Sequence, residues 1–211
     1  FNPVPLKTAD LTIPLLVTVP NATAAGGACA KPTAGWPVVI VQHGLRGNRF
    51  EALAMADSFA DACFIVAAID LPLHGLTDTT NPFYQAPNER TFNVDLVNNT
   101  TGAAPADGKI DPSGQHTINL GSPLTSRDNL RQGEADLIVV TKSLANLDIT
   151  GDGVSDVDKT RISYVGLSLG GIVGGGHLHF ANDTRTATLS VPGGVITQLL
   201  LDSPTFGPGI I

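Results

Sequence analysis

The sequence predicts an α/β fold, with a mostly parallel sheet covered by helices on both faces. Short runs of β-branched and other apolar residues alternate along the chain with stretches of helical spacing. The apolar runs are continuous, as in strands buried on both faces, and such alternation requires crossovers between parallel strands. The 211 residues, 42% of them hydrophobic and 15% charged, suffice for one domain with a substantial core. We therefore treat residues 1–211 as a single domain.

The expected elements follow from local patterns. An early strand over 11–19 is interrupted by Pro14, and the β-branched run from Val38 to Val41 places a stronger strand over 35–44. The other expected elements, in order, are a helix over 50–62, a strand over 64–70, a helix over 128–147, strands over 161–165 and 187–191, and a short helix over 194–201.

Residues 76–127 do not fit this alternation. They are polar and rich in Asn, Thr, Gly and Pro, and a connection of that length is rarely structureless without a function. The sequence predicts an irregular, cap-like insert that passes over the sheet's edge.

The strongest local motif is GLSLG at 166–170, which fits G-x-S-x-G between a predicted strand and a predicted helix. Such a sharp turn strains the central residue, and glycines on either side remove side chains that would collide. Ser168 is therefore the expected nucleophile. It would lie near a helix N-terminus, and the backbone N–H of Leu169 would be one donor to an oxyanion.

The segment His43-Gly44-Leu45 follows a second buried strand and is expected to complete this site. The Leu45 N–H would be the other oxyanion donor, with Gly44 allowing close approach of the backbone. His43 either contacts substrate or packs beneath the site, and as a base it would lie on the wrong strand. His74, in the segment DLPLHG, either forms a wall of the substrate pocket or orders its own loop.

These residues resemble the α/β-hydrolase fold and, more narrowly, the bacterial virulence-factor lipase family of extracellular esterases and lipases. The resemblance covers roughly residues 28–210 and implies a carboxylic-ester hydrolase that forms an acyl-enzyme on Ser168. It also implies a small-molecule or lipid ester as substrate, no organic cofactor, and a location that is secreted, at the cell surface or periplasmic. The stretches that carry it are GWPVVIVQHGLRGNRF, AAIDLPLHG, SRDNLRQGEADL, GDGVSDVDKTRISYVGLSLGGIVG and SVPGGV.

The catalytic acid and histidine are not evident. In this fold they follow the serine, but His177 and His179 would lie roughly 13–16 Å along the helix from Ser168, unless the glycines at 174–176 break it. Asp202 is expected to be structural. We therefore expect a fold truncated at its C-terminal side, with the acid and histidine on a further segment or a second polypeptide.

Two other functions remain open from the sequence. A binding or surface module that kept the fold and lost the triad would also lack a base. The same machinery would equally serve a thioester or a peptide, because the motif does not encode the leaving group. In an ester hydrolase, Phe83, Tyr84 and Phe92 would either line an apolar acyl pocket or form the insert's own small core.

An acidic stretch before the serine strand partly matches a calcium loop, with glycine at the sixth position but Lys159 where a bidentate glutamate belongs. It is either a structural calcium site or a solvated acidic turn. The candidate ligands are Asp148, Thr150, Asp152, Asp156 and Asp158.

The cysteines, the net charge and the hydropathy indicate the compartment and limit the partners of the chain. Cys29 and Cys63 form either one disulfide, typical of an oxidising compartment, or two buried thiols. A net charge of −7 disfavours a nucleic-acid partner, and no apolar run reaches the ~18 residues of a membrane span.

Overall fold

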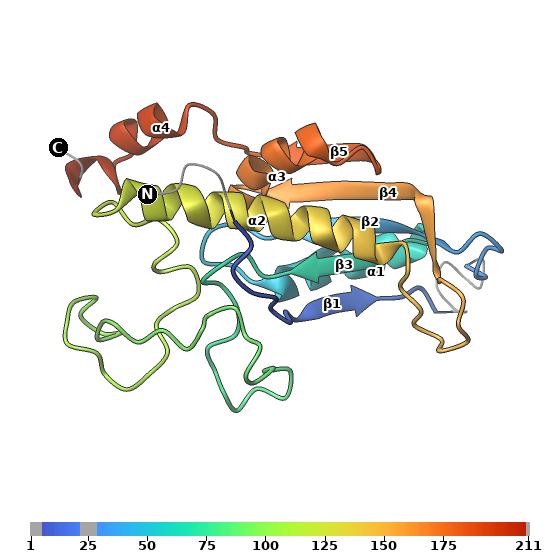
Figure 1. Cartoon of the computed structure of the whole chain (residues 1–211), viewed down its shortest axis with the longest axis horizontal. Helices are drawn as coiled ribbons and strands as arrows, with labels where there is room; N and C mark the ends of the chain where they lie inside the picture. The colour runs from blue at the N-terminus through green and yellow to red at the C-terminus, as the bar shows by residue number, and fades with distance from the viewer. Residues whose placement is uncertain (1–5, 22–28, 210–211) are drawn as a thin grey trace.

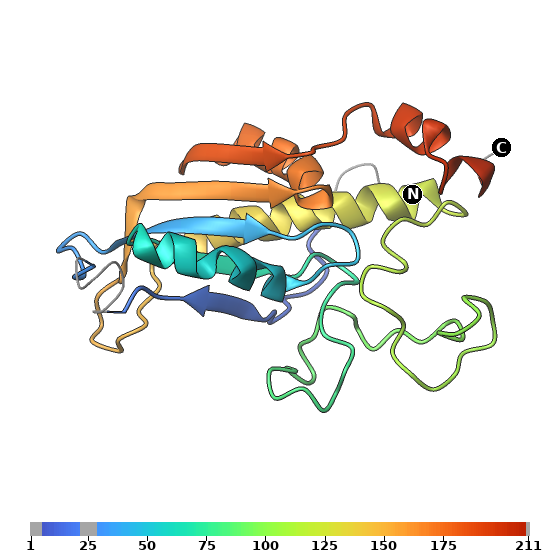
Figure 2. The same cartoon turned by 180° about the vertical axis from the view of Figure 1, so that it is seen from behind.

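The computed structural model describes residues 6–21 and 29–209 and shows one sheet with helices on both faces, as the sequence predicts (Figures 1 and 2). The apolar runs explain this arrangement, because β2 and β3 are buried along their whole length. In the described part of the chain the strands are β1 (Leu15–Thr18), β2 (Trp36–Gln42), β3 (Ile65–Ile69), β4 (Val157–Leu167) and β5 (Thr184–Ser190).

The strand order is β1-β3-β2-β4-β5. Strands β3, β2, β4 and β5 run parallel to their neighbours, so their carboxyl ends meet at one edge of the sheet. Among the strands of the described residues, β1 at the edge is the one that pairs antiparallel, with β3. It begins directly after Pro14, which cannot donate to a strand ladder, and this shortens the strand expected over 11–19.

Helix α1 (Leu53–Asp61) covers one face, and α2 (Pro123–Leu144) and α3 (Leu169–Phe180) cover the other (Figures 1 and 2). On the α1 face, Val39 and Val66 pack with Met55 and Phe59. On the opposite face the larger core gathers side chains from the sheet and both helices, including Ile40, Ile65, Leu137, Ile162, Tyr164 and Val173.

Several expected boundaries were wrong by a few residues. Helix α2 begins at Pro123 rather than 128, because proline at the first helical position lacks only an N–H that would have no partner there. It ends at Leu144 rather than 147. Strand β4 starts at Val157 rather than 161, β5 starts at Thr184 rather than 187, and the last helix, α4, spans Ile196–Asp202.

The insert over 76–127 leaves the carboxyl end of β3 and consists of turns until α2 begins (Figure 1). A buried ion triad fastens it to the body of the fold. The Arg49 guanidinium hydrogen-bonds to Asp70 at 2.5 Å and to both carboxylate oxygens of Glu89, at 2.7 and 2.9 Å. Arg90, which follows Glu89 in the insert, forms an ion pair with Asp136 of α2 at 2.7 Å. Adjacent insert residues are thus tied to different elements.

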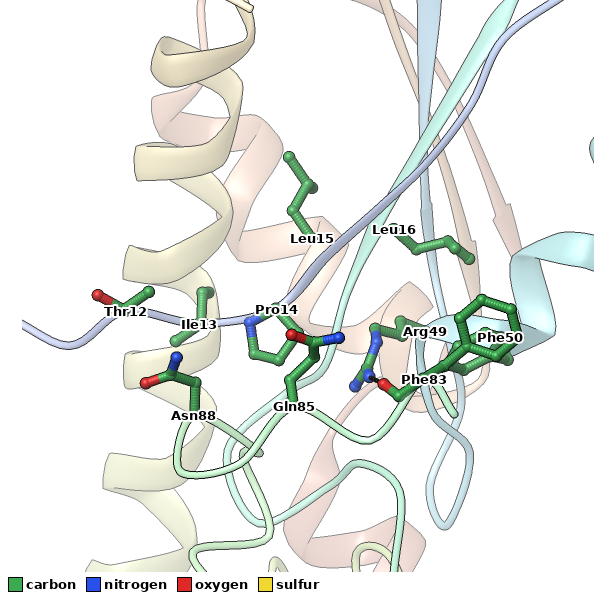
Figure 3. A pocket seen from close by; sticks show the side chains of 10 residues that line it. All are labelled: Thr12, Ile13, Pro14, Leu15, Leu16, Arg49, Phe50, Phe83, Gln85 and Asn88. Atoms are coloured by element: carbon green, nitrogen blue, oxygen red, sulfur yellow. Dashed lines mark hydrogen bonds between the residues drawn. The ribbon is translucent and has the colours of Figure 1, made fainter. Parts of the chain in front are cut away.

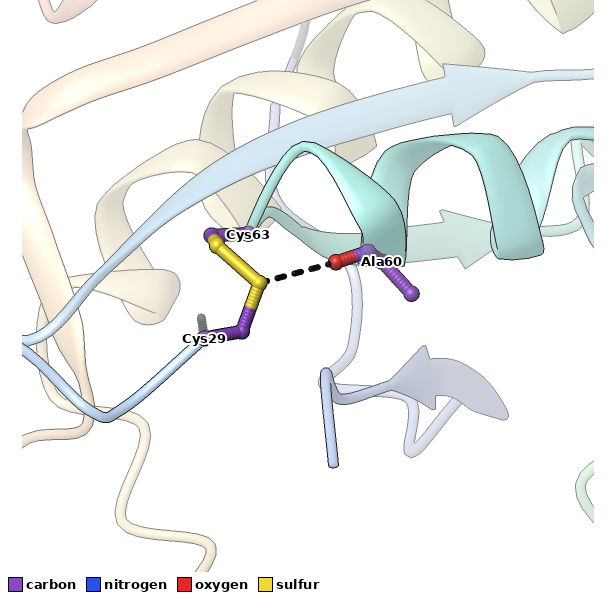
Figure 4. The surroundings of a disulfide bond; sticks show 3 residues. All are labelled: Cys29, Ala60 and Cys63. Atoms are coloured by element: carbon purple, nitrogen blue, oxygen red, sulfur yellow. Dashed lines mark hydrogen bonds between the residues drawn. A yellow bond between two sulfur atoms is a disulfide. The ribbon is translucent and has the colours of Figure 1, made fainter. Parts of the chain in front are cut away.

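The predicted disulfide is confirmed (Figure 4). Cys29 and Cys63 are joined across a sequence separation of 34, with their Cα atoms 5.3 Å apart. The Cys29 sulfur lies 3.3 Å from the Ala60 carbonyl oxygen at the end of α1. The bond therefore ties the chain that leads into β2 to the turn before β3. Across residues 6–21 and 29–209, no helix combines the length and apolar character needed to span a bilayer.

Candidate active site

Ser168 stands at the sharp turn between β4 and α3. Its backbone has φ 50° and ψ −110°, a region that L-residues seldom adopt, and its side chain is exposed. The Ser168 N–H donates to the Ser190 carbonyl oxygen at 2.9 Å, which anchors the turn to the end of β5. The strand–turn–helix geometry that G-x-S-x-G predicts is thus present.

Gly166 and Gly170, two residues either side of Ser168, must be glycine because a Cβ at either position would collide with the backbone. A Cβ at Gly170 would lie 2.3 Å from the Gln42 carbonyl oxygen and 2.8 Å from that of His43. A Cβ at Gly166 would lie 2.4 Å from the Gly170 carbonyl oxygen. Without these side chains, α3 starts directly against the end of β2, which brings Ser168 beside the loop after that strand.

The loop after β2 faces the serine hydroxyl. A Cβ at Gly44 would lie 3.9 Å from Ser168 Oγ. The Gly47 N–H donates to the Gly44 carbonyl oxygen at 3.1 Å, so residues 44–47 form a β-turn with Leu45 at its second position. In a β-turn the N–H of the second residue has no acceptor within the turn, which here is the Leu45 N–H. The first N–H groups of a helix have no acceptor within the helix, and Leu169 is the first residue of α3. In the described residues, neither Leu45 nor Leu169 has an acceptor for its N–H.

His43 lies beneath this turn, with both ring nitrogens engaged. Nε2 accepts from the Leu71 N–H at 3.1 Å, so the proton is on Nδ1, which donates to the Gly44 carbonyl oxygen at 2.7 Å. The side chain is 1% exposed, and burial lowers the pKa of His43 to about 4. His43 is therefore neutral and supports the Gly44–Leu45 peptide, rather than facing a substrate.

His74 is fully buried against His43, with the ring centroids 4.8 Å apart. Its Nδ1 lies 2.9 Å from the Pro72 carbonyl oxygen, and in the described residues its Nε2 has no hydrogen-bond partner. Burial, reinforced by the neighbouring His43, lowers the pKa of His74 to about 4. The structure gives His74 the loop-ordering position, not that of a pocket wall.

The histidines that follow the serine do not approach it. Helix α3 runs unbroken through the glycines at 174–176. His177 is fully buried, 3.4 Å from Thr141 Oγ1 on α2, and burial lowers its pKa. His179 is exposed beside Phe180, and Asp202 accepts from Gln198. None of these is a base for Ser168.

One histidine–carboxylate pair was missed at the sequence level. Asp111 Oδ2 lies 2.7 Å from His116 Nε2 within the insert, and the Asp111 side chain is almost fully buried. Because Asp111 also accepts the Leu96 N–H at 2.7 Å, it orders an irregular loop that no periodic pattern marks. In the described residues, no hydrogen bond joins this pair to Ser168.

The acidic stretch before β4 forms a turn in which the carboxylates accept hydrogen bonds from nearby groups. Asp148 accepts the N–H groups of Gly151 and Gly153, at 2.6 and 2.8 Å. Asp156 is ion-paired with Lys31. The hydrogen bond from Lys31, together with those from the Thr150 and Ile149 N–H groups, lowers the pKa of Asp156 to about 2.

Asp158 turns instead toward Thr160 and Arg161, which lower its pKa to about 2. Within residues 6–21 and 29–209, no three His, Cys, Asp or Glu side chains are grouped to hold a metal ion. As described, these residues form a hydrogen-bonded acidic turn, and calcium binding there stays a prediction.

The aromatic residues of the insert lie near its surface. Phe83 and Phe92 are 59% and 50% exposed, and the Tyr84 hydroxyl donates to Asn93 at 2.7 Å. Phe83 packs against Phe50 with ring centroids 5.4 Å apart and ring planes tilted by 52°, and both line a cavity of about 310 Å³ (Figure 3). That cavity does not include Ser168, and neither does a larger one of about 740 Å³ between residues 7–15 and α2. Ser168 opens directly to solvent.

The chain matches no protein-family model, and no curated protein sequence is significantly similar to it. Several solved structures are distantly similar. A ferulic acid esterase from Streptomyces cinnamoneus is 18% identical with a TM-score of 0.44, over 72% of this chain and 35% of that one. An acetyl xylan esterase from Paenibacillus sp. R4 is 20% identical with a TM-score of 0.43, over 75% and 40%.

Acetyl xylan esterase 1 from Thermoanaerobacterium sp. JW/SL YS485 is 15% identical with a TM-score of 0.46, over 85% of this chain and 48% of that one. The chain thus spans between about a third and a half of the length of these proteins. The similarity is too distant to transfer an activity to this chain.

Proposed function

We propose that this chain carries the nucleophile and oxyanion hole of a serine carboxylic-ester hydrolase. The observation that carries the proposal is the strained, exposed Ser168 beside the turn at 44–47, with the N–H groups of Leu45 and Leu169 unused. Ser168 Oγ attacks the ester carbonyl while a general base takes its proton. The two N–H groups stabilise the oxyanion, and the alcohol leaves with that proton. Water then hydrolyses the acyl-enzyme and restores Ser168.

We further propose that the general base and its acid come from polypeptide outside the described residues, on a C-terminal segment or a second chain. The absence of a base near Ser168 among the described residues supports this. So does β5, most of whose residues are exposed although parallel strands are normally covered on both faces. The disulfide supports a secreted, cell-surface or periplasmic location, and the substrate would be a small-molecule or lipid ester.

The test uses the natural polypeptide, meaning the protein as purified from the organism that makes it. It is labelled with a fluorophosphonate, and the product is read by intact mass and peptide mapping. We expect one adduct at Ser168, lost in Ser168→Ala and retained in Ser203→Ala, a control serine near the end of α4. Hydrolysis of p-nitrophenyl esters should disappear with the adduct. A folded natural polypeptide that neither labels nor hydrolyses esters would refute the proposal.

A binding module without catalysis is the second candidate, favoured by the lack of a base near Ser168 in the described residues. It predicts no adduct on a folded protein that still binds ligand. If the adduct forms, parallel assays with an oxygen ester, a thioester and an anilide of the same acyl group would separate an esterase from a thioesterase or a peptidase.

A further inference from the structure

The turn at 44–47 is held in a conformation that its own residues do not favour. Arg46 occupies the third position with φ 67°, as in a type II turn, where glycine or asparagine is usual. An arginine in the left-handed region costs about 1 kcal/mol, and such strain persists only where surrounding contacts determine the geometry. The position of the Leu45 N–H therefore depends on what packs against Arg46 and Gly47.

Insert residues 113–115, named here the insert wedge, make those contacts. The Ser113 hydroxyl donates to the Gly47 carbonyl oxygen at 2.6 Å and accepts the Gly75 N–H at 3.1 Å. It therefore bridges the turn after β2 and the loop after β3. Gln115 Oε1 accepts from Arg46 Nη2 at 2.7 Å, so the strained residue is also held by its side chain.

Gly114, the middle residue of the insert wedge, allows the wedge to approach the turn at 44–47 closely. The Gly114 N–H donates to the Leu73 carbonyl oxygen at 2.8 Å, and its φ is 69°. A Cβ at Gly114 would lie 2.9 Å from the Arg46 backbone nitrogen and 2.3 Å from His74 Nε2. The wedge thus lies directly against the Arg46 backbone and against His74, whose ring adjoins that of His43 beneath the turn.

We infer that the insert wedge positions the oxyanion turn, with Ser113 as the positioning residue that acts through the Gly47 carbonyl. It fixes one end of the turn while His43 holds the Gly44 carbonyl at the other. The Leu45 N–H between them then points where an oxyanion forms, at no cost of reorganisation during the reaction. This inference rests on the proposed function, and it makes the insert part of the site's framework.

The test compares Ser113→Ala, which loses both hydrogen bonds, with Ser113→Thr, which keeps the hydroxyl. The control is Ser122→Ala, an insert serine whose hydroxyl is paired with Thr125 at 2.7 Å. In this chain, hydrogen–deuterium exchange at residues 44–48 should accelerate roughly tenfold in Ser113→Ala and stay unchanged in the control. In the natural polypeptide, kcat should fall roughly tenfold with KM within twofold, because the donor acts mainly in the transition state. Ser113→Thr should restore both values.

Unchanged exchange at 44–48 in a folded Ser113→Ala variant would overturn the inference, as would unchanged kcat in an active polypeptide. An equal loss in Ser122→Ala would also overturn it, by showing a general effect of loosening the insert. Failure of the proposed function gives a different result, namely no fluorophosphonate adduct on the unmodified protein. In that case the exchange comparison still decides whether Ser113 holds the turn.

Discussion

At the scale of single residues, Ser168 shows how local strain and close packing depend on each other. Its backbone could relax if α3 moved away from the sheet, but α3 starts against the carbonyl groups at the end of β2. The Tyr164 hydroxyl also donates to the Gly170 carbonyl oxygen at 2.6 Å, which holds the first turn of the helix from below. The strain at one residue is therefore maintained by contacts at its neighbours.

Replacing Gly170 with alanine tests this dependence. The new Cβ would meet backbone atoms that cannot move away, so we expect Gly170→Ala to lower the free energy of unfolding by about 3 kcal/mol or more. The matched control is Gly175→Ala in the same helix, where nothing lies within 4 Å of the added atom. It should gain about 0.5–1 kcal/mol from helix propensity. Urea denaturation measures both, and equal effects would contradict the packing argument.

The buried, adjoining histidines His43 and His74 make stability depend on pH. Both have pKa values of about 4 in the fold, below the ordinary 6.5, so the unfolded chain binds more protons between those values. Stability should therefore fall as pH drops from about 6.5 toward 4, by up to about 3 kcal/mol for each histidine. Urea denaturation at pH 7, 5.5 and 4.5 measures the slope. His74→Gln should flatten it, because one of the two buried imidazoles is then removed. An unchanged slope in His74→Gln would refute the assignment.

At the scale of elements, the insert is fastened by buried charge rather than by an apolar core. Arg49, Asp70 and Glu89 are each at least 95% buried as side chains, and Glu89 also accepts the Gln85 and Leu76 N–H groups. Removing one partner of a buried ion cluster leaves the others unpaired and away from water. The triad should therefore control whether the insert, and with it the insert wedge, stays docked.

Glu89→Ala should release the insert. We expect a loss of about 3–5 kcal/mol in stability and faster limited proteolysis within 76–127. Asp78→Ala is the control, because within residues 6–21 and 29–209 this exposed insert carboxylate bonds only to nearby Thr80. Peptide mapping locates the cuts by mass. Cleavage that stays as slow in Glu89→Ala as in Asp78→Ala would show that the triad is not what holds the insert.

The elements that the sequence predicted best are those whose pattern is local. The buried run in β2, the run in β3 and the G-x-S-x-G turn depend on neighbouring residues, and all lie close to where they were expected. The role of Ser113 could not be predicted, because its hydroxyl bonds a backbone carbonyl 66 positions away and no periodicity marks such a contact. For the same reason, the spacing of the acidic stretch did not reveal that Lys31 pairs with Asp156.

At the scale of the whole molecule, the disulfide reinforces the side of the sheet where the neighbouring strands β2 and β3 begin. Cys29 follows a segment outside the described residues and packs into the larger core at 2% exposure, while Cys63 belongs to the turn after α1. Helix α1 is the element that covers its face of β2 and β3. Constraining its end therefore helps to keep that face of the sheet covered.

Breaking this bond should lower the stability of the whole chain. Closing a loop across a separation of 34 residues removes conformations mainly from the unfolded state, which corresponds to about 3–4 kcal/mol. We expect the double variant Cys29→Ser and Cys63→Ser to show that loss in urea denaturation. The unmodified protein should show it on adding a reducing agent, which should not affect the double variant. If reduction left the midpoint of the unmodified protein unchanged while mass spectrometry confirmed two free thiols, α1 would be held by packing alone.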